Sequence, residues 1–295
     1  MTEPFGALAP SAFEARVRAL GGRLPTTSFG RKAASLLLGP AGGRARRAYD
    51  VSVFDTQKAR LHPYDNICEK RVYLTPQFWE AAEREALAAR IAAHDRDVFT
   101  FVDIGANVGL YTLFARAECA RRGLRLDALC IEADPDMQER LAFNRRASAA
   151  ESEIRIVGCA ASDADGSLRF AVNRKSRGMS RLDVGGEIEV SARPLLAILN
   201  EAGITRIDAL KIDIEGHEAA ALSAFFRDAP AALHPDLAIV ETSHAEEAAS
   251  AEAPFVAADY AVALRTKRNV VLAKAARARI AGDAAGSANC AERTR

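Results

Sequence analysis

The chain has 295 residues, of which 49% are hydrophobic and 27% charged, and its formal net charge is +1. This length fits one large domain with an extension, and the apolar content can form a core that needs no disulfide or metal. The near-neutral charge gives no global field that would mark a binder of nucleic acid or acidic membranes. Five widely spaced cysteines without a C-x-x-C pair argue against a disulfide framework or zinc ribbon and suit a reducing cytosol.

Residues 1–95 are expected to form an N-terminal extension. Residues 1–50 carry eight Arg or Lys against three Asp or Glu and are rich in Gly and Pro, which predicts a loosely packed, flexible basic lead-in. A transit peptide or an RNA contact stays open there. No apolar stretch has the length of a membrane span or the pattern of a signal peptide, so a cytoplasmic protein is expected.

The second half of the extension predicts short strands and a helix. HPYDNICEKRVYL (62–74) indicates short extended segments. Pro76 then predicts the start of a helix over 77–93, because a proline in the first helical turn lacks an N–H that would have no partner there.

From residue 98 onward, apolar runs alternate with helical stretches, which is the pattern of a parallel sheet covered on both faces. Their near-continuous Ile, Val, Leu and Phe content predicts strands buried on both sides. The runs cover 98–105, 126–133, 154–161, 207–214 and 236–243, and helices are predicted over 110–121, 137–147 and 218–226.

Two departures from strict alternation are predicted. Between the third and fourth runs come strands at 167–172 and 187–192, a loop rich in Arg, Ser and Gly, and a helix over 194–203. At the end, two strands joined by a polar turn over 261–275 predict an antiparallel hairpin. The expected fold class is therefore α/β, with a Rossmann-like, mostly parallel sheet over 96–276 that ends in a β-hairpin and is followed by a flexible tail over 277–295.

FVDIGANVGLYTLFAR (101–116) predicts a buried strand, a glycine turn and a helix. Gly105 and Gly109 let the backbone pass close to a ligand, and Asn107 tolerates left-handed dihedral angles. The NAD fingerprint requires G-x-G-x-x-G, whereas the spacing here is G-x-x-x-G. Asp103 would repel a diphosphate but would attract a ligand that carries ammonium and sulfonium groups, such as S-adenosylmethionine.

Acidic residues follow the next two predicted strands. Glu132 ends the second run, where a carboxylate can accept both ribose hydroxyls of an adenosine. Asp163 follows the third run in a turn and could accept the adenine amino group. Each carboxylate alone is more often a turn former or a solvated strand end. Three at consecutive strand tips, with Asp103 included, favour a nucleoside site.

The fourth run, ALKIDIEGHEAAAL (209–222), places charges inside a buried strand, where they are costly without a partner or ligand. Lys211 could simply pair with a carboxylate. Adjacent strand tips are expected to direct the acidic and histidine side chains toward one cleft, where they could act as a general base or hold a divalent metal. These candidates are Asp213, Glu215, His217, Glu241 and His244.

Together, DIGANVG, IEADP, CAASDADGSLRF, KIDIEGHE and LAIVE resemble FkbM-type methyltransferases in order and approximate spacing, over about residues 99–241. That family is known for S-adenosylmethionine-dependent O-methylation, often of sugars or polyketides. The resemblance implies a class I methyltransferase fold and this cofactor. It places Asp103, Gly105, Asn107 and Gly109 in the cofactor loop, Glu132 at the ribose, Asp163 at the adenine, and Asp213 with Glu215 at the methyl-transfer cleft.

The resemblance leaves several questions open. The acceptor is expected to be a small molecule or a glycan rather than a nucleic acid, and its hydroxyl would be deprotonated by Glu215, His217 or His244. The alternatives are an NAD-dependent oxidoreductase, a metal-dependent hydrolase that uses Asp213, Glu215 and His217, and a methyltransferase-like binding module without catalysis. Metal dependence and oligomeric state stay open.

Overall fold

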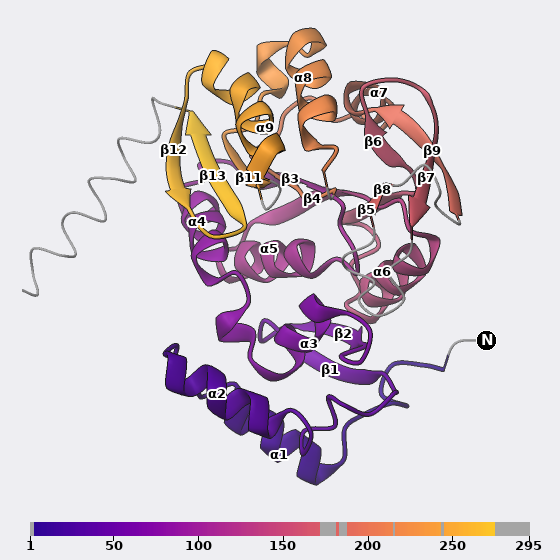
Figure 1. Cartoon of the computed structure of the whole chain (residues 1–295), viewed down its shortest axis with the longest axis vertical. Helices are drawn as coiled ribbons and strands as arrows, with labels where there is room; N and C mark the ends of the chain where they lie inside the picture. Colours follow the sequence, from indigo (N-terminus) through magenta and orange to yellow (C-terminus); the bar gives the residue numbers. More distant parts are fainter. Residues whose placement is uncertain (1–2, 172–180, 183–187, 215, 243–244, 275–295) are drawn as a thin grey trace, which may run out of the picture.

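A computed structural model describes residues 3–171, 181–182, 188–214, 216–242 and 245–274 (Figure 1). Its centre is a seven-stranded sheet of order β12-β13-β11-β10-β3-β4-β5. The strands from β11 to β5 are parallel, and β13 is antiparallel to both β11 and β12, so the predicted mostly parallel sheet with a closing hairpin is confirmed. The strands are β3 Val98–Ile104, β4 Arg125–Ile131, β5 Ile154–Val157, β10 Ala209–Ile212, β11 Leu237–Glu241, β12 Tyr260–Arg265 and β13 Asn269–Lys274.

Helices cover both faces of this sheet (Figure 1). Side chains of a strand alternate between faces, so Phe101 packs in the core on the α5 side and Val102 in the core on the α8 side. One face carries α4 Ala81–Ala92, α5 Leu110–Arg121 and α6 Pro135–Ala147, and the other carries α7 Leu195–Glu201, α8 Glu218–Asp228 and α9 Ala245–Ala257, with a short 3-10 turn η3 at Ala231–Leu233.

The third apolar run divides between two sheets. It breaks at Gly158, so that β5 stays in the seven-stranded sheet while β6 (Ala160–Ser162) begins a separate four-stranded sheet of order β6-β9-β7-β8. The sequence predicted one continuous strand because both halves are apolar. The other strands of the smaller sheet are β7 Gly166–Ala171, β8 Arg181–Leu182 and β9 Ile188–Pro194.

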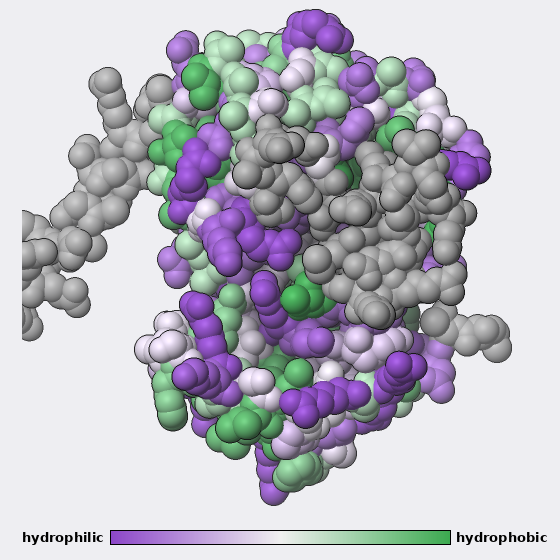
Figure 2. Space-filling view, viewed as in Figure 1, coloured by the Kyte–Doolittle hydropathy of each residue, from purple (hydrophilic) through white to green (hydrophobic). Residues whose placement is uncertain are grey.

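The N-terminal residues differ from the loosely packed lead-in that their composition predicted. They form α1 (Ala12–Gly21) and α2 (Ser28–Leu37), at the lower end of the molecule in Figure 1. Ser11 and Glu14 form a reciprocal capping box at α1, and the Thr27 hydroxyl caps α2. From the same side, Figure 2 shows apolar residues between hydrophilic ones over this end. These caps, together with the packing of the buried Gly21 against Leu74, stabilise helices in a segment whose Gly and Pro content favours loops.

The segment over 62–74 is also different from its prediction. After the antiparallel pair β1 (Tyr49–Val53) and β2 (Gln57–Leu61), the chain forms helix α3 over Ile67–Leu74 rather than extended segments. The Asn66 side chain caps α3 by accepting from the backbone N–H groups of Cys68 and Glu69. The helix predicted over 77–93 is a 3-10 turn η1 (Pro76–Phe78) followed by α4, because Glu80 between them has a left-handed backbone with φ of 40°.

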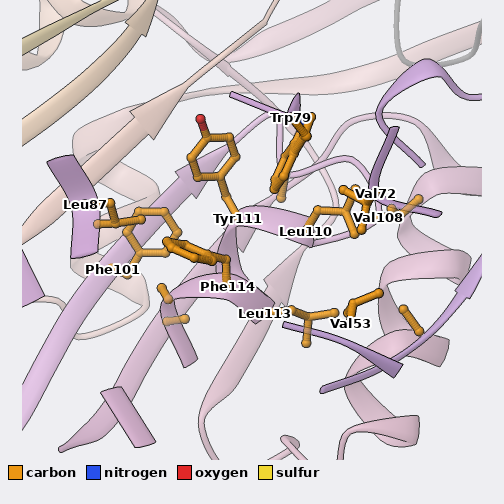
Figure 3. Packing of buried hydrophobic residues seen from close by; sticks show 14 of the residues in the cluster. Val53, Val72, Trp79, Leu87, Phe101, Val108, Leu110, Tyr111, Leu113 and Phe114 are labelled. Carbon is orange, nitrogen blue, oxygen red and sulfur yellow. The ribbon is translucent and has the colours of Figure 1, made fainter. Parts of the chain in front are cut away.

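The extension and the sheet share one hydrophobic core (Figure 3). Val72 and Trp79 of the extension pack in the same cluster as Tyr111 of α5 and Phe101 of β3. Arg18 of α1 also donates to the Tyr73 carbonyl oxygen at 2.7 Å. The extension is therefore part of the folded body. None of the helices within the described ranges is long and apolar enough to cross a membrane.

Candidate active site

The glycine turn lies between β3 and α5, at the carboxyl edge of the sheet. Gly105, Asn107 and Gly109 all have left-handed backbones, with φ of 70°, 53° and 80°. A Cβ atom at Gly105 would overlap the Asp213 carbonyl oxygen, and one at Gly109 would overlap the Leu141 side chain. The two glycines thus allow close packing of neighbouring elements as well as the turn itself.

Five successive backbone N–H groups of this turn are hydrogen-bonded within the protein. Gly105 and Ala106 both donate to the Ile131 carbonyl oxygen, at 2.9 and 3.1 Å, and Gly109 donates to the Ala106 carbonyl oxygen at 2.8 Å. The other two N–H groups donate to side chains: Asn107 to Glu132 Oε2 at 2.6 Å, and Val108 to Asn107 Oδ1 at 2.9 Å. A dinucleotide site needs free N–H groups here to hold a pyrophosphate. This turn offers none of these five to an anion.

Glu132, which directly follows β4, has a buried carboxylate at the cavity wall. Its two oxygens accept from the backbone N–H groups of Asn107 at 2.6 Å and Asp134 at 2.8 Å, and the residue is 7% exposed. Burial raises the pKa of Glu132 to about 7, although these hydrogen bonds act in the opposite direction. Ligand hydroxyl groups that donate to this carboxylate would stabilise its charged form.

A buried cation lies among the carboxylates of the neighbouring strands. Lys211 of β10 donates to Asp213 Oδ2 at 2.9 Å, so the lysine pairs with a carboxylate. Burial raises the pKa of Asp213, but the Lys211 charge, side-chain hydrogen bonds with Glu241 and Lys211, and the Arg268 charge together hold that pKa below its ordinary value. Asp103 is 1% exposed and accepts from the Thr112 hydroxyl at 2.7 Å, and burial raises its pKa.

These groups line one cavity at the ends of β3, β4 and β10. The glycine turn, Glu132, Lys211 and Asp213 form one side, and Met137 and the small residues Ala160 and Ala161 form a less polar side. The remaining wall comes from the extension, through Ile67, Cys68, Trp79 and Glu80. Asn66 Nδ2 donates to Asn107 Oδ1 at 2.8 Å and so connects the cap of α3 to the glycine turn.

Glu80 is a cavity residue that sequence reasoning missed. Burial raises the pKa of its carboxylate, while nearby Lys211 and the hydrogen bond from Tyr111 act in the opposite direction. The Tyr111 hydroxyl donates to Glu80 Oε2 at 2.6 Å. A strained left-handed backbone at a non-glycine residue often marks a functional position. The sequence carried no local sign of this conformation, because Trp-Glu-Ala reads as the interior of a helix.

The other predicted site residues have different positions. Glu241, at the end of β11, pairs with Arg268 at 3.1 Å, and Arg268 lines the cavity. His217 Nε2 is 3.0 Å from the Ser162 hydroxyl, and neither residue is part of the cavity wall. Asp163 is exposed and accepts from the same hydroxyl at 3.1 Å. Glu215 and His244 lie outside the described residues.

A second, open groove adjoins the cavity. It has a volume of about 770 Å³, and Glu80 and Arg268 line both spaces. Thr26 and Arg31 of the extension and Lys267 of the terminal hairpin also line it. Both shared residues interact electrostatically with Asp213, and Glu80 also interacts with Lys211. Within the described ranges, no three His, Cys, Asp or Glu side chains cluster as metal ligands.

The strand order, the closing hairpin and the acidic tips of β3 and β4 define a Rossmann-like class I methyltransferase fold. The family model described as "Methyltransferase FkbM domain" matches residues 103–260, which is more than half of the chain. The chain therefore belongs to the FkbM methyltransferase family, as its motifs predicted.

The solved structures that match this chain are distant in sequence. The methyltransferase FkbM from Methylobacillus flagellatus KT is 18% identical, with a TM-score of 0.43, over 70% of this chain and 54% of that one. The METTL16 MTase domain is 10% identical, with a TM-score of 0.48, over 89% and 90% of the two chains. TrmK of M. capricolum, solved with S-adenosyl-homocysteine, is 10% identical over 64% and 67%, with a TM-score of 0.35. This chain thus spans about half the length of the Methylobacillus protein. No curated protein matches it.

Proposed function

We propose that this protein transfers the methyl group of S-adenosylmethionine to a hydroxyl oxygen of a small-molecule or glycan acceptor. One observation carries the proposal: the N–H groups of the glycine turn are used internally, while buried carboxylates line the cavity beside the turn. Such a site suits ribose hydroxyls and a cationic amino acid group and disfavours a diphosphate. For that reason we favour a methyltransferase over an NAD-dependent oxidoreductase.

The cavity residues fit this cofactor. Glu132 would accept the ribose hydroxyls, and Asp103 would attract the ammonium group of the methionine part. Ala160 and Ala161 leave room for the adenine, with Met137 as an apolar contact. When bound, the cofactor supplies an electrophilic methyl group on a sulfonium. Asp163 has no place in this proposal because it is exposed and does not line the cavity.

The acceptor would reach the site through the open groove. Its hydroxyl would meet the cavity at Glu80 and Arg268, the two residues that both spaces share. Glu80 would take the hydroxyl proton, because a carboxylate of raised pKa is a stronger base near neutral pH than one of depressed pKa. Asp213 is the weaker base and instead fixes the Lys211 ammonium beside the site. Loss of that proton to Glu80 would leave the acceptor oxygen ready to receive the methyl group that the bound cofactor would supply.

Isothermal titration with S-adenosylmethionine and, separately, with NAD tests the cofactor. We expect binding of the former only, with a loss of at least tenfold in affinity in Asp103→Ala and in Glu132→Ala, since each removes a charged hydrogen-bond acceptor worth about 1.5–3 kcal/mol. Binding of NAD instead, or of neither ligand, contradicts the proposal.

Variants of the groove test the chemistry. Release of S-adenosyl-homocysteine over a panel of hydroxylated sugars and polyketides should fall about 10²- to 10⁴-fold in Glu80→Gln, the usual contribution of a general base. Asp213→Ala should abolish turnover or cofactor binding. Glu85→Gln is the matched control, because Glu85 lines the same groove and is exposed. Cofactor binding without transfer to any acceptor would favour the non-catalytic binding module.

A further inference from the structure

The first two helices carry the same short pattern on their exposed sides. Within the described residues, four of the seven exposed large hydrophobic side chains lie on α1 and α2. Phe13 and Leu20 are 65% and 57% exposed, and Phe29 and Leu36 are 73% and 79% exposed. In each helix a phenylalanine is followed by a basic residue three positions on and a leucine seven positions on, and these basic residues are Arg16 and Lys32.

This spacing places each set on one side of its helix, since positions three and seven apart lie close together around a helix. The sides that contact the body are different: Val17 and Gly21 are buried in α1, and Gly30 is buried in α2. The repeated sets therefore face away from the core. Apolar residues are visible among hydrophilic ones over this end of the molecule in Figure 2.

The charged side chains of α1, α2 and the turn between them that have no ion-pair partner among the described residues are positive. Arg16, Arg23 and Lys32 are exposed, whereas Glu14 of α1 is held by Arg47 at 2.8 Å and by the Tyr49 hydroxyl. Large apolar side chains with Arg and Lys beside them on a short helix are typical of helices that lie in the interface of an anionic membrane. We propose that α1 and α2 dock this protein on an anionic lipid surface.

A second copy of the chain fits this face less well. A symmetric dimer apposes the same patch of both subunits, so the positive charges of Arg16 and Lys32 would be brought close to the same positive patch of the second copy and repelled by it. Anionic headgroups remove that repulsion and leave the phenylalanine and leucine side chains to enter the acyl boundary. Arg31 of α2 also lines the open groove, which places the lipid contact beside the region where the acceptor would enter.

Co-sedimentation of the full chain with vesicles tests this proposal. We expect binding to vesicles of phosphatidylglycerol and phosphatidylcholine in equal parts, and weak binding to pure phosphatidylcholine. The double variant Phe29→Ser, Leu36→Ser should lower the partition coefficient about 100-fold, at about tenfold for each buried apolar side chain. Arg16→Glu with Lys32→Glu should remove the preference for anionic vesicles, and added salt should weaken binding of the wild type.

The matched control is Val256→Ser with Val262→Ser, which removes two other exposed apolar side chains at 61% and 47% exposure and should leave vesicle binding unchanged. All these positions are exposed, so thermal unfolding should confirm that each variant is folded. Binding that is absent, that does not discriminate between the vesicles, or that falls equally in the control overturns the proposal. A wild-type dimer that Phe29→Ser converts to a monomer would also overturn it, in favour of a second copy.

Discussion

The two sides of the cavity are built from different kinds of sequence. On the sheet side, Asp103 is the last residue but one of β3, and Glu132 and Asp213 directly follow β4 and β10, so their place near the sheet edge follows from the strand pattern alone. On the extension side, Glu80 lines the cavity and Asn66 is bonded to the glycine turn, and these contacts join residues 31 and 41 positions apart in the chain. The sheet side of the site can therefore be predicted from local sequence motifs, whereas the extension side depends on packing between residues that are distant in the chain.

The two halves also differ in what holds them. The glycine turn is fixed by backbone hydrogen bonds and by steric fit to β10 and α6. The extension wall depends on side chains: the Asn66 cap, the Tyr111 hydrogen bond to Glu80, and the apolar packing around Trp79. Substitutions on the sheet side should therefore act through backbone clashes, and those on the extension side should act gradually through lost side-chain contacts.

The largest effect is expected at Gly105. Gly105→Ala would place a methyl group against the Asp213 carbonyl oxygen on a backbone with φ of 70°. Because the neighbour is backbone rather than a flexible side chain, β3 and β10 would have to separate. We expect cofactor affinity to fall by about 100-fold or more, which corresponds to about 3 kcal/mol, together with a lower melting temperature. Isothermal titration with S-adenosyl-homocysteine and calorimetric unfolding measure both.

Gly123 provides the matched control for that clash. It has the same φ of 70°, but a Cβ atom there would meet nothing within 4 Å. Gly123→Ala should therefore cost only the left-handed backbone strain of about 1–2 kcal/mol and leave cofactor affinity unchanged. Equal losses of affinity in the two variants would show that backbone strain, rather than the contact with β10, controls the turn.

The second-largest effect is expected at Asn66 and tests whether the extension contributes to cofactor binding. Asn66→Ala removes the cap of α3 and the hydrogen bond to Asn107, each worth about 1 kcal/mol, so we expect cofactor affinity to fall about 30-fold. The control is Ser11→Ala, which removes the cap of α1 away from the cavity and should lower stability by about 1 kcal/mol without changing affinity. An unchanged affinity in Asn66→Ala would restrict the extension to a structural role.

The sheet could be predicted because strong local patterns and tertiary packing agree there. The helix predicted over 110–121 has those bounds, and the runs over 98–105, 126–133, 207–214 and 236–243 each contain a strand. In the extension the signals conflict. The capping box at Ser11 marks a helix start, but the surrounding Gly and Pro residues favour loops. The helix over 67–74 has a weak apolar pattern, and its Asn66 cap decides its conformation.

The candidate site divides in the same way. The pattern of the sequence placed Gly105 and Glu132 at one sheet edge and Lys211 inside the fourth strand, and the pairing of Lys211 with a carboxylate was among its alternatives. It could not find Glu80, because the left-handed backbone of that residue depends on how α4 packs. It also could not foresee that His217 would lie beside Ser162 and outside the cavity wall, since that contact joins residues 55 positions apart.

A smaller effect is expected from pH. Burial raises the pKa of Glu132 from 4.5 to about 7, so its contribution to stability is fully present below pH 4.5 and is lost as pH rises through about 7. Ribose hydroxyls donate to the ionised carboxylate, so cofactor binding should have the opposite trend and tighten as pH rises toward 7. We expect about tenfold weaker binding at pH 6 than at pH 7.5 by titration calorimetry. Glu132→Gln should bind more weakly but with a flat profile over this range; a pH dependence that survives the substitution would assign it to another group.

The smallest effect is expected at Asp163. For this residue the family resemblance and the structure predict different roles, so its substitution distinguishes between them. The family resemblance places this residue at the adenine, whereas its carboxylate is exposed and bonded to its neighbour Ser162. A solvated side chain outside the cavity wall contributes little to binding, so Asp163→Ala should change cofactor affinity less than about threefold, or less than about 0.7 kcal/mol. Parallel titrations of Glu132→Ala provide the comparison. A loss of tenfold or more in Asp163→Ala would mean that the turn after β6 closes over the adenine when the cofactor binds, and the sequence motif would then describe the bound site better than the geometry of the free chain.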